Sequence, residues 1–358
     1  MQNFFGGQNF HHILKCFRIY PTKAFKLFWI QIFYFFVSHC FSECFTLFYI
    51  ISSYFCRRSY LNAVHGPDHD VTDAWLTAGA VSLATQEIKI VTAVQPGFKL
   101  PAVVAKLSAA LQNQPGGGRF GLSGIAGWWQ LEVESYGDVW LAHGDRYARL
   151  EEYLQIIRGL WTTADFNYRG KYYTITQGIL AERPTPLPLV FIAGESERAI
   201  DLAARLGDYL FINADDVEKT AALVEKVKRW ASDRYQRQIQ VAMSAFAIVR
   251  PTRVEAESRL DKIYRAADTR KIRYFQQQID ANAVAHNKLD IGQTIEANLG
   301  LSARFVGDPQ TVIRRLRDYE SIGVDLIIFK FESTREDALY FHQQVIDRYS
   351  HPYPLISR

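Results

Sequence analysis

From about residue 70 onward, the apolar positions of the chain switch repeatedly between two spacings. Residues 72–86, 99–114 and 145–161 carry apolar side chains at every third or fourth position, the pattern of an amphipathic helix. Between such stretches lie short runs rich in valine, isoleucine and leucine, which predict buried strands. After residue 85 the expected strands are 87–95, 119–127, 188–194, 208–214, 238–249 and 324–331.

This alternation of strands and helices predicts the fold class. Strands that are joined through helices by short loops lie parallel, so we expect an α/β protein, either a doubly wound sheet or a (β/α) barrel. A closed barrel of about eight strands needs two more than the runs found after residue 85. Residues 166–176 interrupt the alternation with the pattern of a small hairpin.

The segment 1–59 differs from the rest in composition. It contains all four cysteines of the chain and an apolar, aromatic run over 27–55. That run is long enough to cross a bilayer and has basic residues on both sides, which is compatible with a membrane anchor. A secretory signal is less favoured, because the apolar stretch is too long and no cleavage site is clear. The third interpretation is a mis-joined sequence that is foreign to the fold.

The remaining composition limits the classes of partner. The 358 residues carry a net charge of +4, with opposite charges interleaved along the helices, which gives no case for a nucleic-acid partner. No cysteine follows Cys56, as in intracellular proteins, so we expect a cytoplasmic location unless 27–55 is a genuine anchor. We divide the chain into an N-terminal segment over 1–59, unrelated to the barrel, a barrel over 60–345 and a tail over 346–358.

In a barrel of this kind, functional side chains lie at the carboxyl ends of the strands. The stretch "VFIAGESERAI" ends a strand at Gly194 and begins a helix near Ser196, which offers backbone N–H groups and a hydroxyl to a phosphate. Glu195 opposes an anion there unless its carboxylate points away. His143 and Asp145 could form an acid–base pair, but a helix cap at Asp145 is the simpler interpretation.

Two clusters have atoms that could bind a metal. The histidines and aspartates of "HGPDHDVTDAW" are better explained as a polar loop that caps the next helix. The His11, His12 and Cys16 cluster lacks the paired spacing of a zinc site, so we predict no metal site. The glycine motifs of dinucleotide-binding folds, hydrolase elbows and phosphate loops are absent from the sequence.

Several stretches, taken together, resemble the luciferase-like flavin-dependent monooxygenases, and most closely their dimethylsulfone and alkanesulfonate monooxygenase branch. They are "DAWLTAGAVSLATQEIKIVTAVQP", "GWWQLEVESYG", "HGDRYARLEEYLQIIRGLW", "FNYRGKYY", "FIAGESERAIDLAAR", "AFAIVR" and "GVDLIIFKF", in family order. The resemblance covers residues 61 to 341 approximately. It implies a (β/α)8 TIM-type barrel of the bacterial luciferase type that binds reduced FMN from a separate NAD(P)H-dependent flavin reductase. With dioxygen, such an enzyme oxidises a small organosulfur compound, releasing the sulfur group and an aldehyde. The resemblance also implies a homo-oligomer.

The resemblance implies roles for single residues. Trp128 and Trp129 would wall the flavin and substrate pocket and keep water away. Arg146 and Tyr147 would hold the flavin phosphate together with the helix start at Gly194. The expected cofactor-binding residues are Gln95, Ser123, Arg146, Tyr147, Gly194, Glu195 and Ser196.

Two further residues are expected to act at the pocket. His143 is the candidate for acid–base chemistry. Arg304 lies in a glycine-containing loop, "NLGLSARFVGDP", and could close over the pocket as part of a lid.

The chain departs from the family pattern in two places. Sulfonate-cleaving relatives place an Arg and a His on the seventh strand, where this chain has Ser244 and Phe246. These two residues are therefore expected to line a pocket for a neutral sulfone such as dimethylsulfone, rather than an anionic alkanesulfonate. Nothing in 1–59 resembles the first strand, first helix and second strand of the family, so the barrel is expected to lack two strands.

This gap leaves two alternatives open. One is an inactive, incomplete barrel that serves as a membrane-tethered binding or structural module. The other is an oxidoreductase of the same superfamily that uses a deazaflavin cofactor in place of FMN.

Overall fold

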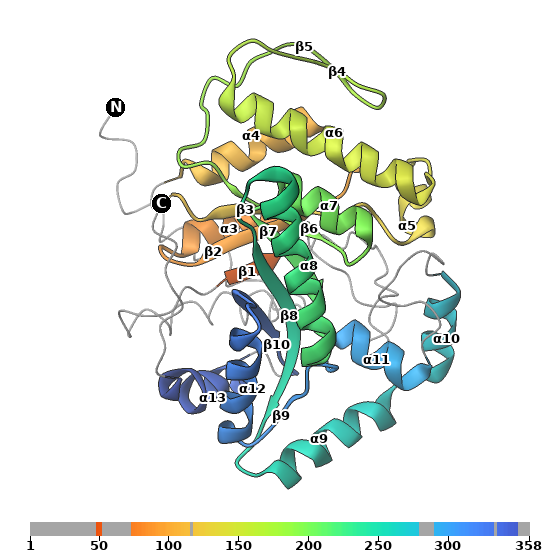
Figure 1. The fold of residues 1–358 in the computed structure, drawn as a ribbon, viewed down its shortest axis with the longest axis vertical. Helices are drawn as coiled ribbons and strands as arrows, with labels where there is room; N and C mark the ends of the chain where they lie inside the picture. Colours follow the sequence, from red (N-terminus) through yellow and green to blue (C-terminus); the bar gives the residue numbers. More distant parts are fainter. Residues whose placement is uncertain (1–47, 52–72, 115–116, 279–289, 333–334, 350–358) are drawn as a thin grey trace, which may run out of the picture.

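A twisted parallel sheet forms the centre of the molecule in the computed structural model, which describes residues 48–51, 73–114, 117–278, 290–332 and 335–349 (Figure 1). Seven parallel strands follow one another in the spatial order β1-β2-β3-β6-β7-β8-β10, and β9 pairs with the end of β8. The two ends of this order, β1 and β10, contact each other, as strands do in a barrel. The predicted fold class, an α/β fold of the TIM-barrel type, is confirmed.

All six strands expected after residue 85 are present, and the expected hairpin forms a separate antiparallel pair. The strands are β1 (Phe48–Ile51), β2 (Lys89–Val94), β3 (Phe120–Gly124), β4 (Phe166–Arg169), β5 (Thr174–Gly178), β6 (Leu189–Ala193), β7 (Tyr209–Asn213), β8 (Gln240–Val249), β9 (Phe305–Gly307) and β10 (Leu326–Lys330).

No strand is expected before residue 60 from the sequence, whereas the structure places β1 there. β1 runs parallel to β2, with Phe48 opposite Lys89 and Ile51 opposite Thr92. The sheet therefore includes residues of the segment 1–59 and of the candidate anchor 27–55. A short apolar run fits a strand or part of a membrane span equally well, which is why spacing alone missed it. The rest of that segment, including His11, His12 and Cys16, lies outside the described residues, as does the polar loop over 65–70.

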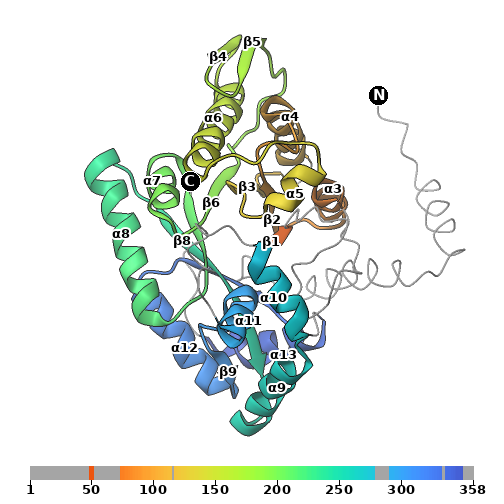
Figure 2. The same cartoon turned by 90° about the vertical axis from the view of Figure 1, so that its right-hand side faces the viewer.

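Helices cover the outer face of the sheet (Figures 1 and 2). The helices are α3 (Ala74–Ala84), α4 (Pro101–Gln112), α5 (Gln130–Ser135), α6 (His143–Thr162), α7 (Glu197–Leu206), α8 (Val217–Tyr235), α9 (Arg253–Ala266), α10 (Thr269–Gln278), α11 (Ile291–Leu299), α12 (Pro309–Ser321) and α13 (Glu336–Gln344), followed by a 3-10 turn at Ile346–Arg348. Several begin at a side chain that accepts a backbone N–H, such as Asp216 before α8 and Asp308 before α12, where Pro309 also favours the first turn.

Alternate residues of each strand face opposite sides of the sheet. One set packs against the outer helices. The other set points inward, where Phe191, Tyr209 and Ala242 form a cluster that Leu326 of β10 joins. The Phe191 and Tyr209 rings stack at 4.4 Å between centroids. Residues further along the same inward faces therefore lie toward the carboxyl ends of the strands, where this fold class holds its functional sites.

A second, smaller core covers the carboxyl half of β8. Phe246 and Ile248 pack there with buried residues of the insertion α9–α11, among them Leu260, Ile272 and Ile295 (Figure 2). This insertion places a helical layer over the end of the sheet at which β8 terminates.

Within the part of the chain that the structure describes, none of the helices combines the length and the apolar run that a bilayer crossing requires.

Candidate functional site

Tyr147 on α6 meets the loop that joins β6 to α7. Its hydroxyl oxygen lies 2.8 Å from the point where a Cβ would stand on Gly194, and it forms a hydrogen bond with the Ser196 side chain. Burial raises the pKa of Tyr147 by more than the hydrogen bond with Ser196 lowers it. The hydroxyl therefore stays protonated at neutral pH. Three of the residues expected to bind a phosphate are thus brought together.

Gly194 is required at this contact by its backbone. Its φ of +136° is a conformation that L side chains rarely adopt, and a Cβ would also stand 2.9 Å from the Cβ of Ala199. Any larger residue would push the β6–α7 loop away from Tyr147. The glycine allows the close approach between α6 and the start of α7.

Ser196 begins α7 in the way that the sequence predicts. Its Oγ accepts the backbone N–H of Ala199 at 3.2 Å, so it is the N-cap of the helix. The guanidinium carbon of Arg198 lies 3.2 Å from the point where a Cβ would stand on Gly144 of α6. The starts of α6 and α7 are therefore neighbours, and both helix dipoles and Arg198 favour a negative charge between them.

Glu195, which opposed an anion in the sequence analysis, points toward β7. Its Oε1 accepts the backbone N–H of Asn213 at 3.1 Å. Burial raises the pKa of Glu195 to about 7, an effect that the Asn213 hydrogen bond reduces and the Asp215 charge adds to. A carboxyl group with this pKa carries a full negative charge only above neutral pH. Its repulsion of a neighbouring anion is weakened accordingly.

Arg146 is buried and turned toward the segment that precedes α6. Its Nη1 donates to the carbonyl oxygen of Leu141 at 2.8 Å, and its guanidinium carbon lies 4.0 Å from the centroid of the Trp140 ring. Its charge lowers the pKa of Tyr147, so the guanidinium still acts on the candidate phosphate site. Its expected role in holding the phosphate remains a prediction.

His143 begins α6, and its ring lies edge-to-face on Tyr147 at 5.1 Å between centroids. The expected helix cap at Asp145 is wrong. α6 starts at His143 with Ala142 as its N-cap, three residues before the expected cap, and the Asp145 carboxylate accepts from Lys171 and Tyr172, each at 2.7 Å. The acid–base pair of Asp145 with His143 remains a prediction.

Trp128 and Trp129 stack on each other at 5.9 Å between centroids, but only one of them is a core residue. Trp129 is 3% exposed, and Trp128 is half-buried. Gly127 before them has a φ of +95°, and a Cβ there would stand 3.1 Å from Nε2 of Gln95. The end of β2 therefore supports the tryptophan loop that follows β3.

Ser123, Ser244 and Phe246 occupy inward-facing positions on their strands. Ser123 is paired with Ala93 of β2, and it is 2% exposed. Ser244 is almost buried and lies two residues beyond Ala242 of the inner cluster. Phe246 packs against the α9–α11 insertion, so its expected place in a substrate pocket is at the boundary between the barrel and that insertion.

Arg304 precedes β9, whose Phe305 pairs with Ala247 of β8, and its side chain is bound to the α9–α11 insertion. Its Nη2 forms an ion pair with Glu296 of α11 at 2.8 Å, and Tyr264 of α9 donates to the same carboxylate at 2.6 Å. The side chain is 48% exposed. The structure thus places Arg304 on the insertion, where it joins α9 and α11, and its expected closure over the pocket remains a prediction.

Two charged residues outside the predicted site have strongly shifted pKa values in the structure. Lys330 ends β10 opposite Phe246 of β8, and burial lowers its pKa to about 8. Glu132 of α5 is 4% exposed, and burial raises its pKa to about 7. Lys330 lies near the carboxyl end of the predicted strand 324–331, and that position alone could have marked it as a candidate site residue. Glu132 gave no signal, because a short helix after a tryptophan pair has no distinctive spacing.

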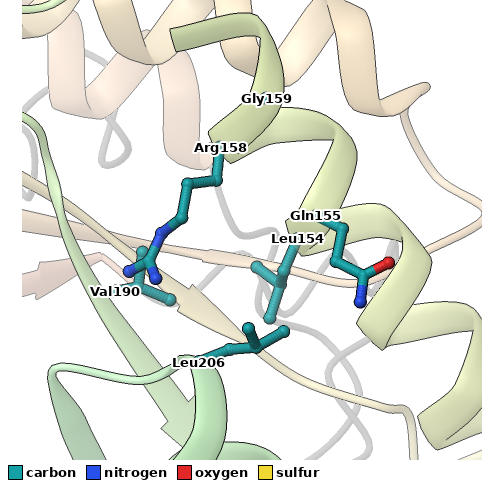
Figure 3. Close-up of a pocket in the computed structure, with 6 residues that line it drawn as sticks. All are labelled: Leu154, Gln155, Arg158, Gly159, Val190 and Leu206. Atoms are coloured by element: carbon teal, nitrogen blue, oxygen red, sulfur yellow. The ribbon is translucent and has the colours of Figure 1, made fainter. Parts of the chain in front are cut away.

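A hollow of about 170 Å³ lies elsewhere on the described surface (Figure 3). It is formed between α6, α7 and the start of β6, where Arg158 and Gln155 border an apolar floor of Leu154, Val190 and Leu206. Val190 is at the amino end of β6, opposite the end that carries Gly194. The hollow is therefore separate from the candidate site.

Comparisons with known proteins identify the family of the chain. The family model described as "Luciferase-like monooxygenase" matches residues 45–326. The chain belongs to this family. The match begins before residue 48, so it includes β1. The recognition of the family and the assignment to the monooxygenase class of enzymes are thereby confirmed.

Curated relatives include two enzymes named FMNH2-dependent dimethylsulfone monooxygenase. One, from Pseudomonas fluorescens (strain Pf0-1), is 31% identical over 274 residues, 75% of each chain. The other, from Pseudomonas putida, is 30% identical over 276 residues, 75% of this chain and 76% of the relative. A crystal structure of a riboflavin lyase with modified FMN and riboflavin has a TM-score of 0.72 at 16% identity, covering 89% of this chain and 83% of the other. That likeness concerns the fold.

Proposed function

We propose that this chain is a reduced-FMN-dependent monooxygenase that uses dioxygen to oxidise a small organosulfur compound, dimethylsulfone or a close analogue. The names of the two curated relatives support the cofactor and the substrate class. The observation that carries the proposal is the meeting of Tyr147 with Gly194 and Ser196 at the start of α7. Reduced flavin would come from an NAD(P)H-dependent flavin reductase.

The residues at the start of α7 fit the phosphate of FMN. The Tyr147 hydroxyl, the Ser196 hydroxyl and the backbone N–H groups of the first turn offer donors, and Arg198 adds positive charge. Glu195 would not oppose the phosphate while its carboxyl group is protonated. Its raised pKa extends the protonated form toward neutral pH. The bound flavin would supply the reaction with dioxygen.

The protein's own contribution is to position the reactants and to keep water out. The half-buried Trp128 ring, which stacks on Trp129, offers an apolar surface in the loop that Gln95 contacts at Gly127, at the carboxyl ends of β2 and β3. Ser244 and Phe246 give the inward face of β8 a small hydroxyl and an apolar ring where sulfonate-cleaving relatives carry charge. Both surfaces favour a neutral sulfone over an anion as the substrate.

A titration with FMN, followed through quenching of its fluorescence, tests the proposal. The purified chain is expected to bind FMN, and riboflavin, which lacks the phosphate, is expected to bind at least tenfold more weakly because charge-assisted hydrogen bonds are lost. With a flavin reductase, NADH and dimethylsulfone, the loaded chain should release formaldehyde. A folded chain that takes up neither flavin would refute the proposal. Binding of a deazaflavin in place of FMN would favour the deazaflavin-dependent oxidoreductase. A chain that binds no flavin and requires detergent would favour the membrane-tethered module.

A further inference from the structure

The β4–β5 hairpin runs along α6 and is fastened to it at its turn (Figure 1). Glu152 of α6 accepts the backbone N–H groups of the turn residues 171–173 at 2.7, 2.9 and 3.2 Å. Gly170 opens this turn, and a Cβ on it would stand 2.3 Å from Oε2 of Glu152. The glycine therefore lets the backbone approach the carboxylate closely. The place of the turn on α6 is thus fixed through its backbone.

The turn carries two donors to a second acid of α6. Asp145 precedes Glu152 by about two helical turns on the same face of the helix. The Lys171 ammonium group and the Tyr172 hydroxyl each donate to Oδ1 of Asp145 at 2.7 Å. Exposed ion pairs are usually weak, partly because two mobile side chains must be ordered. Here both donors start from a backbone that Glu152 already holds, so less ordering is needed.

Asp145 stands at the edge of the candidate phosphate site. Its neighbour in the chain, Gly144, lies against the Arg198 guanidinium of α7, whose carbon is 3.2 Å from the point where a Cβ would stand. Hydrogen bonds from Lys171 and Tyr172 lower the pKa of Asp145, and the charge of Arg198 lowers it further. Arg198 is therefore within electrostatic reach of the Asp145 carboxylate as well as of an anion between the two helix starts.

A carboxylate released from the hairpin at this position would oppose the binding of a phosphate. It would attract the Arg198 guanidinium and repel the anion. Lys171 supplies a compensating charge, and its hydrogen bond directs the Asp145 carboxylate to the hairpin. A similar arrangement is found in the first turn of α7, where Glu197 pairs with Lys226 of α8 at 2.8 Å. The acids of both helix starts are thus held by lysines from neighbouring elements.

We propose that the turn of the β4–β5 hairpin sets the selectivity of the site for a phosphorylated flavin, by keeping the Asp145 carboxylate away from Arg198. This role rests on the proposed function. Lys171 and Tyr172 are positioning residues, because they act through Asp145 rather than through contact with the flavin. The turn therefore raises the affinity for FMN and leaves the affinity for riboflavin unchanged.

Titrations with FMN and with riboflavin at low ionic strength, where charges are least screened, test this role. Lys171→Met removes the compensating charge, whereas Gly170→Ala displaces the turn from Glu152 and leaves every charge in place. We expect each variant to weaken FMN binding about three- to tenfold and to change riboflavin binding less than about twofold. Adding Asp145→Asn to either variant should return the FMN affinity to within about twofold of the original chain, because the competing charge is then gone.

Arg253→Met is the matched control, because it breaks an exposed ion pair with Glu257 on α9. The Arg253 side chain is 72% exposed, compared with 68% for Lys171. This variant should bind both flavins as the original chain does.

Three results would overturn the role of the hairpin turn and leave the proposed function intact. The first is an unchanged FMN affinity in both Lys171→Met and Gly170→Ala. The second is an equal loss of both flavins that Asp145→Asn does not reverse, which would mean that the hairpin only supports α6. The third is a loss of FMN affinity of about threefold or more in Asp145→Asn alone, which would make Asp145 a favourable part of the site. An original chain that binds neither flavin would refute the proposed function, and the role of the turn with it.

Discussion

Replacing Glu195 with glutamine should remove a pH-dependent penalty on folding. Burial raises the pKa of Glu195 from 4.5 to about 7. Below the lower value the carboxyl group is protonated in both the folded and the unfolded chain, and its contribution to stability is complete. Between the two values the unfolded chain loses the proton while the folded chain keeps it, so the free energy of unfolding falls as the pH rises, and the loss is complete above the folded pKa.

The size of this penalty follows from the shift. A difference of about 2.5 pKa units corresponds to about 3.5 kcal/mol at about 1.4 kcal/mol per unit, and partial solvent access to Glu195 makes this an upper limit. The Glu195→Gln variant keeps an oxygen that can accept the N–H of Asn213, but it has no proton to lose. We therefore expect it to gain stability relative to the original chain as the pH rises from 5 to 8.

Urea unfolding at several pH values between 5 and 8.5 measures this difference. Glu197→Gln is the control, because Glu197 is only two residues away in the sequence but is exposed and paired with Lys226 at 2.8 Å. Glu132 has a similarly raised pKa and adds the same slope to every variant, so only the difference between variants is interpreted. Parallel pH profiles for the original chain and Glu195→Gln would show that the Glu195 carboxyl group is ionised and solvated, contrary to this reasoning.

Three further predictions concern the same region and the insertion. Gly194→Ala forces a Cβ toward the Tyr147 hydroxyl at a φ of +136°. It should therefore lower the free energy of unfolding by about 1–3 kcal/mol and weaken FMN binding. An unchanged urea midpoint and an unchanged FMN affinity would contradict this prediction. Tyr147→Phe loses the hydrogen bond with Ser196 and should weaken FMN about three- to tenfold without affecting riboflavin, whereas equal losses for both flavins would exclude a phosphate contact. Arg304→Ala breaks an exposed ion pair with Glu296 and should lower the free energy of unfolding in urea by less than about 1 kcal/mol, while FMN affinity stays constant. A larger loss of stability would mean that the ion pair holds the insertion more firmly than its exposure suggests.

The fold was predictable because buried parallel strands have continuous apolar runs. All strands after residue 85 in the main sheet were found this way except β9, whose three residues are too few to show a period. β1 was missed because its residues lie inside a longer apolar run, in which no turn residue marks the beginning or end of a strand. Register cannot be read from either kind of run. For that reason the pairing of Lys330 with Phe246 emerged only from the structure.

The site was predictable where its residues are close in sequence. Gly194, Glu195 and Ser196 are adjacent, and a strand followed by a capped helix start is a local pattern. Asp145 was misassigned because its partners, Lys171 and Tyr172, come from the hairpin and outcompete a cap at the helix start. Which of the two tryptophans is buried could not be predicted from the sequence, because it depends on the contacts of the loop.

The electrostatics of the loop between β6 and α7 explain how an acid can stand beside an anion site. The positive end of the α7 dipole would lower the pKa of a carboxylate directed at the first turn of the helix. Glu195 instead turns to the N–H of Asn213, and burial dominates its pKa, so the carboxyl group is about half protonated at pH 7 and largely protonated below it. The dipole, the hydroxyl groups of Tyr147 and Ser196 and the charge of Arg198 are then directed at an external anion rather than at Glu195. Affinity for FMN should accordingly decline as the pH rises through 7 in the original chain, and it should decline less in Glu195→Gln.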